Sequence, residues 1–356
     1  MSNDTHSGEV FTCADQRPIP VSARGKHLVI DIHCHLGIPA ADALVQQHYP
    51  GPPPGINDFT SAKTSEVNRA QFAQIGRTLN TIDTRLADMD KLGIDVQALS
   101  PSPGQYFYFT DAEVGRDAAR LVNDGMAEAV AAHPDRFVGM GTVPLQNTEM
   151  AIAEMRRCVR DLDLRGIEIS SNVNGRDLHA EELRPFWAAA EELGVLVFLH
   201  PLGFTHAQRM SEYYFNNLIG NPLESTLAVG HLIFGGVLDA HPGLKICVAH
   251  GGGYMPAYWG RMDHGWRARG DCSEHCRHEP SSYLRKLWFD TLVFDRDELE
   301  SLVRTHGAHR LCLGSDYPFD MSEPDPVGFH DRLDEDVRAK ILGLNAAALL
   351  GIEPTR

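Results

Sequence analysis

The sequence predicts an α/β fold, a (β/α)8 barrel of the TIM type, and three observations favour it. Eight short apolar runs alternate with amphipathic segments of helical period. The runs are apolar at nearly every position, which is typical of parallel strands covered on both faces. Four of them run into His or Asp, as expected at the carboxyl-terminal rim of a barrel. An open doubly wound sheet is less favoured, because no Gly-x-Gly-x-x-Gly follows the first run.

The composition limits the classes of function. The chain has 356 residues, of which 43% are hydrophobic and 22% charged, as in ordinary globular proteins. The net charge of −16, without a dense Lys/Arg run, argues against nucleic-acid or membrane-surface partners and leaves small molecules. We expect no membrane span, since no apolar run approaches the roughly 18 residues needed. Three of the seven cysteines lie inside predicted strands, so we expect free thiols and a cytoplasmic location.

The chain is expected to divide into an N-terminal arm, residues 1–26, and a barrel, residues 27–356. Pro18 and Pro20 argue against regular structure in the arm. The first strand is expected at about 28–33. An irregular insertion, about 36–76, then carries a Pro/Gly cluster and is interpreted as a lid or small insertion over the site, with a surface loop as the alternative.

After the insertion, helices and strands alternate regularly. Gly93 and Gly194 follow two of the helical segments as stop signals, and Thr148 is expected to cap a third. The expected helices span 84–92, 111–132, 148–162, 180–193, 223–240, 255–264, 296–306 and 334–350. The remaining strands are expected at 96–99, 137–143, 166–170, 195–200, 244–250, 287–292 and 310–316.

Histidines at the ends of these strands indicate a metal site. His33 and His35 end the first strand, and side chains two residues apart in a strand point to the same side, whereas Cys34 points away. The fifth, sixth and eighth strands end in His200, His250 and Asp316. In a barrel these strand ends gather at one rim. Unrelated polar strand ends are the less favoured alternative.

Histidine and aspartate ligands suit one divalent cation, with zinc preferred and manganese as the alternative. Such an ion would keep a water molecule in an open position and lower its pKa to near 7. Not all four histidines need bind the ion, because a histidine beside that water is a natural general base. The fourth strand offers no lysine to bridge two ions, which favours a single one, although Glu168 remains a candidate bridge.

The motifs in this order resemble the amidohydrolase superfamily, in particular its branch of metal-dependent decarboxylases. The resemblance covers about residues 28–351. It is carried by Asp31-Ile32-His33-Cys34-His35, Asp88-Met89-Asp90, Val96-Gln97-Ala98-Leu99-Ser100, Arg136-Phe137-Val138-Gly139-Met140-Gly141, Asn172-Val173-Asn174-Gly175-Arg176-Asp177-Leu178, Phe198-Leu199-His200-Pro201, Ala249-His250-Gly251-Gly252-Gly253, Gly260-Arg261 and Gly314-Ser315-Asp316-Tyr317-Pro318-Phe319.

The resemblance implies roles for individual residues. It implies that zinc is held by His33, His35, His200 and Asp316, and that His250 is the catalytic base. It further implies a homodimer in which Arg261 reaches the neighbouring subunit's site and binds a substrate carboxylate.

A second substrate-binding arginine of the family has no clean match in this chain. The candidates are Arg69, Arg77 and Arg85, of which Arg77 is nearest. The insertion also differs from the family's pattern. The resemblance therefore predicts the metal site of this chain better than it predicts the substrate.

The leading functional hypothesis is a carbon–carbon lyase, a metal-dependent non-oxidative decarboxylase in aromatic-compound degradation. Its substrate would be an unsaturated or aromatic carboxylic acid, with His250 and Asp316 as catalytic residues. The alternative is a metal-dependent hydrolase that cleaves a C–C bond or a lactone of a ring-cleavage product, since an activated water serves both reactions. A metal-binding barrel without activity is the non-enzymatic alternative.

Overall fold

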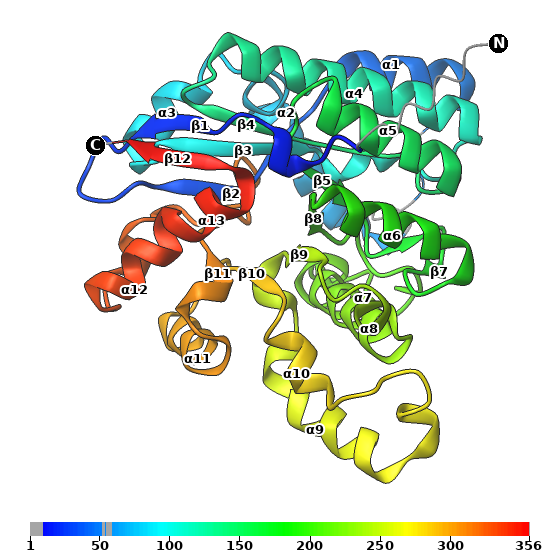
Figure 1. Cartoon of the computed structure of the whole chain (residues 1–356). Coiled ribbons are helices and arrows are strands. Elements are labelled where there is room, and N and C mark those ends of the chain that lie inside the picture. Colours follow the sequence, from blue (N-terminus) through cyan, green and yellow to red (C-terminus); the bar gives the residue numbers. More distant parts are fainter. Residues whose placement is uncertain (1–9, 52–53, 55–58, 356) are drawn as a thin grey trace, which may run out of the picture.

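The computed structural model describes residues 10–51, 54 and 59–355, and it confirms the predicted barrel (Figure 1). Eight parallel strands follow one another in chain order around the sheet. The first strand closes the ring on the last, since the backbone N–H groups of Ile32 and His35 donate to the carbonyls of Leu313 (2.9 Å) and Tyr317 (2.8 Å). The barrel strands are β2 (Ile30–Leu36), β3 (Val96–Pro101), β4 (Phe137–Gly141), β5 (Gly166–Ile169), β8 (Leu196–Leu199), β9 (Lys245–Val248), β10 (Trp288–Asp290) and β11 (Leu311–Cys312).

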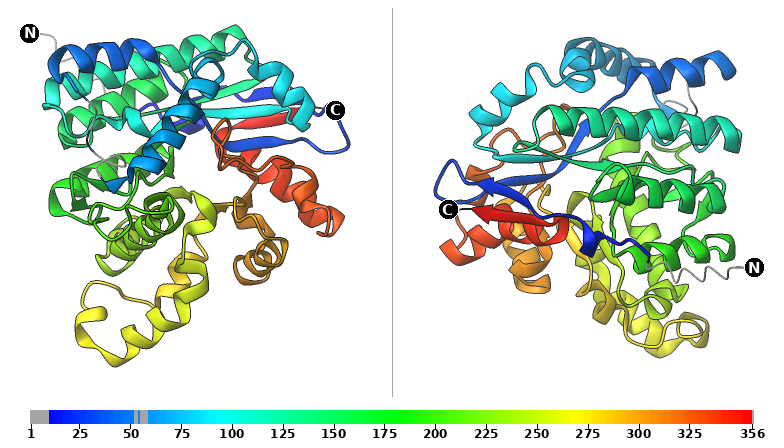
Figure 2. Two further views of the ribbon diagram at one scale, coloured as in Figure 1. Left: turned by 180° about the vertical axis from the view of Figure 1, so that it is seen from behind. Right: turned by 45° about the horizontal axis from the view of Figure 1, so that its top comes forward.

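Helices surround the strands on the outside (Figures 1 and 2). They are α1 (Pro39–His48), α2 (Ala62–Asn80), α3 (Arg85–Leu92), α4 (Ala112–Ala132), α5 (Thr148–Arg160), α6 (Arg184–Leu193), α7 (Asn221–Phe234), α8 (Val237–Ala240), α9 (Met255–Ala268), α10 (Pro280–Leu284), α11 (Arg296–His306), α12 (Glu335–Ala339) and α13 (Asn345–Leu350). In the part of the chain that the structure describes, none of them is long and apolar enough to cross a membrane.

Three helix predictions were wrong in detail. Asn147, not Thr148, caps α5, because its side chain accepts a hydrogen bond from the N–H of Met150 at 3.0 Å. The helix expected at 223–240 breaks into α7 and α8 at two glycines. The helix expected at 334–350 is interrupted by a π-helical turn, Lys340–Leu344.

The barrel interior and the layer beneath the helices form two separate cores. Side chains at alternate strand positions, such as Val96 and Ala98 or Leu196 and Phe198, fill the interior. Ala346 and Leu350 of α13 join this inner cluster. The intervening side chains pack outward against the helices. The apolar inner cluster does not include the polar residues at the carboxyl-terminal ends of the strands, which lie at the rim of the barrel.

A bulge in β2 decides which of its side chains face the interior. Ile30 and Ile32 belong to the inner cluster, whereas Cys34 belongs to the outer one. Strict alternation would have placed Cys34 inside and both histidines outside. The register of β2 against β3 shifts between Asp31 and Cys34, and this shift reverses the alternation. His33 and His35 therefore point into the barrel.

The N-terminal arm contains regular structure, so the expectation drawn from its prolines was wrong. Ile19–Ser22 forms β1, which pairs in parallel with β12 (Ile352–Thr355) in a separate two-stranded sheet (Figure 2). Proline is tolerated here because each of the two strands has only one neighbour and thus a free edge.

The stretch 36–76 is also more regular than predicted, because it holds α1 and most of α2. Pro39 occupies the start of α1, where the backbone N–H that proline lacks would have no partner within the helix. Ser61 caps α2, because its side chain accepts a hydrogen bond from the N–H of Thr64. The proline cluster is thus confined to the connection between these helices, where residues 52–53 and 55–58 lie outside the described part. The α2 helix borders the site, as the lid interpretation requires.

Candidate metal centre and its cavity

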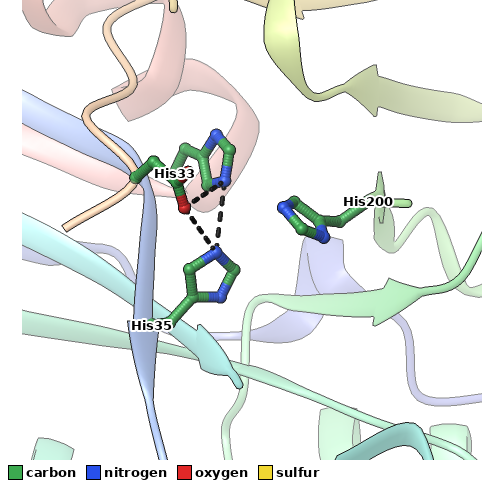
Figure 3. Close-up of side chains that lie close together, drawn as sticks. His33, His35 and His200 are labelled. Carbon is green, nitrogen blue, oxygen red and sulfur yellow. Dashed lines mark hydrogen bonds and ion pairs between the residues drawn. The ribbon is translucent and has the colours of Figure 1, made fainter. Parts of the chain in front are cut away.

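Four buried side chains from three regions of the chain converge inside the rim of the barrel (Figure 3). The Nε2 atoms of His33 and His35 lie 3.2 Å apart, and they lie 3.4 and 3.2 Å from one carboxylate oxygen of Asp316. His200 completes the group, in which all ligand atoms lie within 4.8 Å of one another. The structure thus brings together the four residues that the sequence nominated as ligands.

The group fits a divalent cation. Both ring nitrogens of His200 are buried without a hydrogen-bond partner in the described ranges, although buried polar atoms ordinarily have one. Burial favours a higher pKa of Asp316, but His33 and His35 outweigh it and hold that pKa well below its usual range. The site therefore combines an ionised carboxylate with a neutral imidazole that lacks a partner. Three nitrogens and one oxygen are a common ligand set for zinc and related ions.

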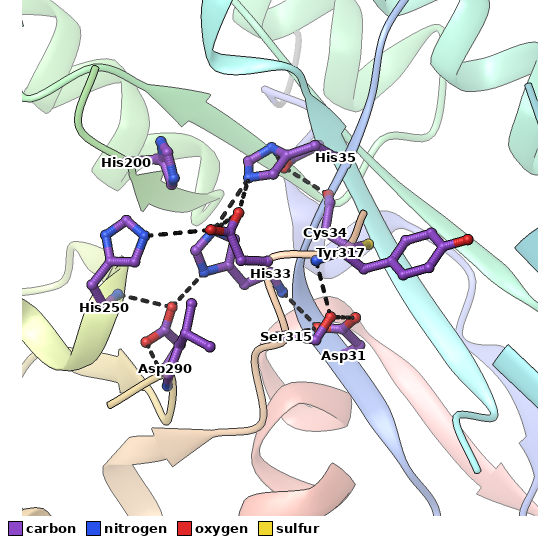
Figure 4. Close-up of polar contacts among 12 residues, drawn as sticks. Asp31, His33, Cys34, His35, His200, His250, Asp290, Ser315 and Tyr317 are labelled. Carbon is purple, nitrogen blue, oxygen red and sulfur yellow. Dashed lines mark hydrogen bonds and ion pairs between the residues drawn. The ribbon is translucent and has the colours of Figure 1, made fainter. Parts of the chain in front are cut away.

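The other nitrogens of the two strand histidines are held by fixed acceptors. His33 Nδ1 lies 2.6 Å from a carboxylate oxygen of Asp290, and His35 Nδ1 lies 2.9 Å from the carbonyl oxygen of Pro101. Each contact fixes a ring orientation and leaves Nε2 directed at the centre (Figure 4). Gly314 allows this close packing, since a Cβ there would lie 2.8 Å from the Cβ atoms of His33 and Asp290.

His250 faces the same centre from the end of β9. Its Nε2 lies 4.0 Å from Asp316, and its ring centroid lies 5.0 Å from that of His200. Its backbone is left-handed, with a φ of 56°, a conformation that non-glycine residues adopt mainly at constrained sites. Burial and the neighbouring His33 lower the pKa of His250 to about 4. His250 is thus a neutral imidazole able to accept a proton.

A cavity of about 620 Å³ opens above these side chains, a size typical of small-molecule sites. His200, His250 and Asp316 contribute to its lining. Aromatic side chains form much of the wall, and the ring of Phe319 lies 5.4 Å from His35 and 6.3 Å from Phe72 of α2. The cavity suits a planar ligand placed against the metal centre.

The arginines nominated for substrate binding do not line this cavity. The side chain of Arg77 is 71% exposed and forms an ion pair with Asp83 at 3.3 Å, so the structure does not support its assignment to the substrate. Arg69 is also exposed. Arg85 is fully buried and donates to Gln97 and to the carbonyl of His35, which makes it a support for β2.

Arg261 lies on the surface of α9, which extends beyond the barrel at the bottom of Figure 1. The helix continues to Ala268, so Arg261 lies near its middle. Neither an ion pair nor a hydrogen bond engages its side chain within the described ranges. Tyr258, on the same helix, is 58% exposed.

Asp290 is the site residue that the sequence analysis did not nominate. It ends β10, but the strand was expected to continue to residue 292, so the rule that selected Asp316, a polar residue at the end of a barrel strand, did not single it out. Besides His33, it accepts from the backbone N–H groups of His250 (2.9 Å) and Gly251 (2.8 Å). It therefore fixes a candidate ligand and the candidate base together.

Comparison with known proteins extends the similarity beyond the site. Residues 30–352 match the profile of a protein family described as Amidohydrolase. The chain is 35% identical to 2-amino-3-carboxymuconate-6-semialdehyde decarboxylase of Dictyostelium discoideum, over 93% of this chain and 94% of the relative. It is 30% identical to gamma-resorcylate decarboxylase of Rhodococcus jostii (strain RHA1), over 78% and 89%.

A solved structure agrees in fold. The 5-carboxyvanillate decarboxylase of Novosphingobium aromaticivorans, complexed with manganese and 4-hydroxy-3-methoxy-5-nitrobenzoic acid, matches with a TM-score of 0.79 and 26% identity. The match covers 94% of this chain and 99% of the other. The resemblance inferred from the motifs is thereby confirmed, and the chain belongs to the amidohydrolase family.

Proposed function

We propose that the protein is a metal-dependent, non-oxidative decarboxylase of an unsaturated or aromatic carboxylic acid, with a role in aromatic-compound degradation. The observation that carries the proposal is the convergence of His33, His35, His200 and Asp316 beneath a cavity that His250 also faces. The similarity to decarboxylases over almost the whole chain supports this reaction over hydrolysis.

These four residues would hold one divalent cation. Zinc is the preferred ion, and manganese is the alternative, because three nitrogens and one oxygen serve both and manganese is bound in one structural relative. When bound, the cation supplies a Lewis acid that neutralises a substrate carboxylate and the charge developing beside it.

The chain's own residues would position the substrate and move the proton. The rings of Phe72 and Phe319 hold a planar substrate against the centre, and α2 shields it from water. His250 first takes up a proton from solvent at Nε2 and then delivers it to the carbon that bears the carboxylate. The bond to the carboxylate then breaks, CO2 leaves, and the bonding electrons restore the conjugated system. Asp316 faces His250 and stabilises the protonated imidazole.

We extend the proposal to a homodimer in the cytoplasm. Tyr254, Tyr258 and Arg261 follow the i, i+4, i+7 spacing of one helical face, and both tyrosines are exposed. A two-fold axis along such a face would let Arg261 enter the neighbour's site and bind the reacting carboxylate. All seven cysteines are free, which supports a reducing compartment.

Product analysis is the direct test of the reaction. Incubating the metal-loaded protein with a panel of hydroxybenzoates and ring-cleavage acids should give products lighter by one CO2 in mass spectrometry. Cleavage of a C–C bond into two fragments, or opening of a lactone, with uptake of one water and without CO2 release would instead establish the hydrolase.

Replacing a ligand should remove the ion. We expect about one divalent ion per chain in the native protein and less than about a tenth of that in His33→Ala or His200→Ala, because each loss leaves a vacancy around the ion. The exposed His264→Ala is the control. Asp290→Ala should weaken metal affinity by about 10- to 100-fold, since it releases the ring of His33. Elemental analysis and metal titration measure both. Full occupancy in His33→Ala would refute the ligand assignment.

Replacing His250 should separate metal binding from turnover. His250→Ala should keep most of its metal yet lose turnover by about 100-fold or more, as expected for a group that transfers the proton. Elemental analysis and kcat are measured on the same sample. Loss of the ion together with activity would make His250 a ligand.

Mixing two inactive variants tests the contribution of Arg261 across the dimer. His250→Ala and Arg261→Ala should each be inactive as homodimers. A mixed dimer contains one site with both native residues, so we expect up to about a quarter of native activity after complete subunit exchange. Native mass spectrometry checks the exchange. Confirmed exchange without recovered activity would show that Arg261 does not act in the neighbour's site.

A further inference from the structure

We propose that the cavity selects a planar substrate with a single carboxylate and neutral oxygen substituents, and that Gln71 of α2 recognises one of those oxygens. This inference rests on the proposed function, since it takes the one carboxylate to lie at the metal centre. It concerns the part of the cavity that holds the rest of the substrate.

The described residues of this chain contribute no cation to the wall of the cavity. Among the described residues that line it there is no lysine or arginine, and its acidic side chains are Asp42, Asp316 and Asp320. The partner subunit's Arg261 is assigned above to the reacting carboxylate. A second carboxylate would therefore lose its hydration without gaining a cationic partner from this chain, and Asp320 would repel it.

The helix that covers the site offers neutral groups instead. Asn68, Gln71 and Phe72 of α2 line the cavity, whereas Arg69 and Arg77 of the same helix are exposed and do not line it. The helix is thus turned so that its amides and its aromatic ring, and not its guanidinium groups, face the substrate.

Gln71 is a hydrogen-bond donor that lacks a partner. Its Nε2 atom is buried, and nothing in the described ranges accepts a hydrogen bond from it. A buried donor without a partner is costly, which indicates that a ligand accepts from it. A hydroxyl, methoxy or carbonyl oxygen on the substrate would satisfy the amide without needing a countercharge.

Phe72 fixes the shape of the substrate. It lies one residue after Gln71, is 50% exposed, and has its ring 6.3 Å from that of Phe319. An aromatic side chain left this open above a metal centre favours a flat ring as its partner. The charge pattern matches an acid of the resorcylate type, with one carboxylate and hydroxyl groups, and disfavours acids of the 5-carboxyvanillate type, which have two carboxylates.

The test measures binding without turnover on the full-length, metal-loaded protein. The probe is 4-hydroxy-3-methoxy-5-nitrobenzoate, in which the nitro group stands for the reacting carboxylate and the remaining carboxylate is the second charge. Its counterparts that carry no charge at the position of this second carboxylate, called the neutral compounds below, are its methyl ester and 2-methoxy-6-nitrophenol, and all three compounds keep the same nitrophenol hydroxyl. By isothermal titration calorimetry, we expect both neutral compounds to bind at least about ten-fold more tightly than the benzoate, because only the benzoate buries the additional, unpaired carboxylate.

Two arginine variants on α2 test whether the selectivity against a second carboxylate arises at Gln71. Gln71→Arg should reverse the order of affinities, since it adds a guanidinium to the wall. Gln74→Arg adds the same charge one helical turn along α2, at an exposed position outside the cavity lining, and should leave the order unchanged. Gln71→Ala should weaken binding of the neutral compounds by about five-fold, the loss of one hydrogen bond.

The outcomes separate this inference from the proposed reaction. Binding of the benzoate as tight as that of its ester, or no binding of the neutral compounds, would overturn the inference. If Arg261→Ala then weakened the benzoate selectively, the countercharge would come from the partner subunit. A protein that ranks the probes as expected but releases no CO2 from 2,6-dihydroxybenzoate or related hydroxybenzoates would keep the substrate selectivity and lose the decarboxylase assignment.

Discussion

The carboxylate of Asp290 is the group on which the geometry of the site depends. It accepts hydrogen bonds from the backbone at His250, Gly251 and Leu292 and contacts the ring of His33, so it joins the ends of β9 and β10 to β2. Burial favours a raised pKa of Asp290, but the contact with His33 outweighs it and lowers that pKa. The charge is therefore retained inside the protein, where its partners compensate for lost hydration. The position of His250 relative to the metal centre follows from this one anchor.

The centre also depends on a defect in an otherwise regular strand. Without the bulge in β2, the alternation that buries Ile30 and Ile32 would direct both histidines at the surrounding helices. The first residues of β2 pack in the barrel interior and its last residues supply the histidines of the site, so the alternation of side chains has to be reversed between them. Bulges are known to redirect side chains next to active sites, and here the bulge lies between the core residues of β2 and its two histidines.

Much of this architecture could be predicted from the sequence, because it follows from period and position. Continuous apolar runs gave the eight strands, and polar strand ends gave His33, His35, His200, His250 and Asp316. The structure differs from the prediction where one local sequence signal is compatible with two structures. Proline marks a break in most contexts, yet Pro39 begins α1 and Pro20 lies in an edge strand. The orientation of α2, which turns Gln71 inward and Arg77 outward, depends on tertiary packing that no short pattern encodes.

The pairing of β1 with β12 has a consequence for the order in which the molecule is assembled. Ser22 and Thr355 share a hydrogen bond of 2.7 Å although they are 333 positions apart in the chain. During synthesis, β1 emerges early and has no strand to pair with until Ile352–Thr355 has been translated. Contacts of such long sequence separation form late, since the whole intervening chain must first be brought together. Pairing of β1 with β12 is therefore a late step of folding. Until β12 has been translated, β1 keeps an unpaired edge that chaperones or other chains can bind.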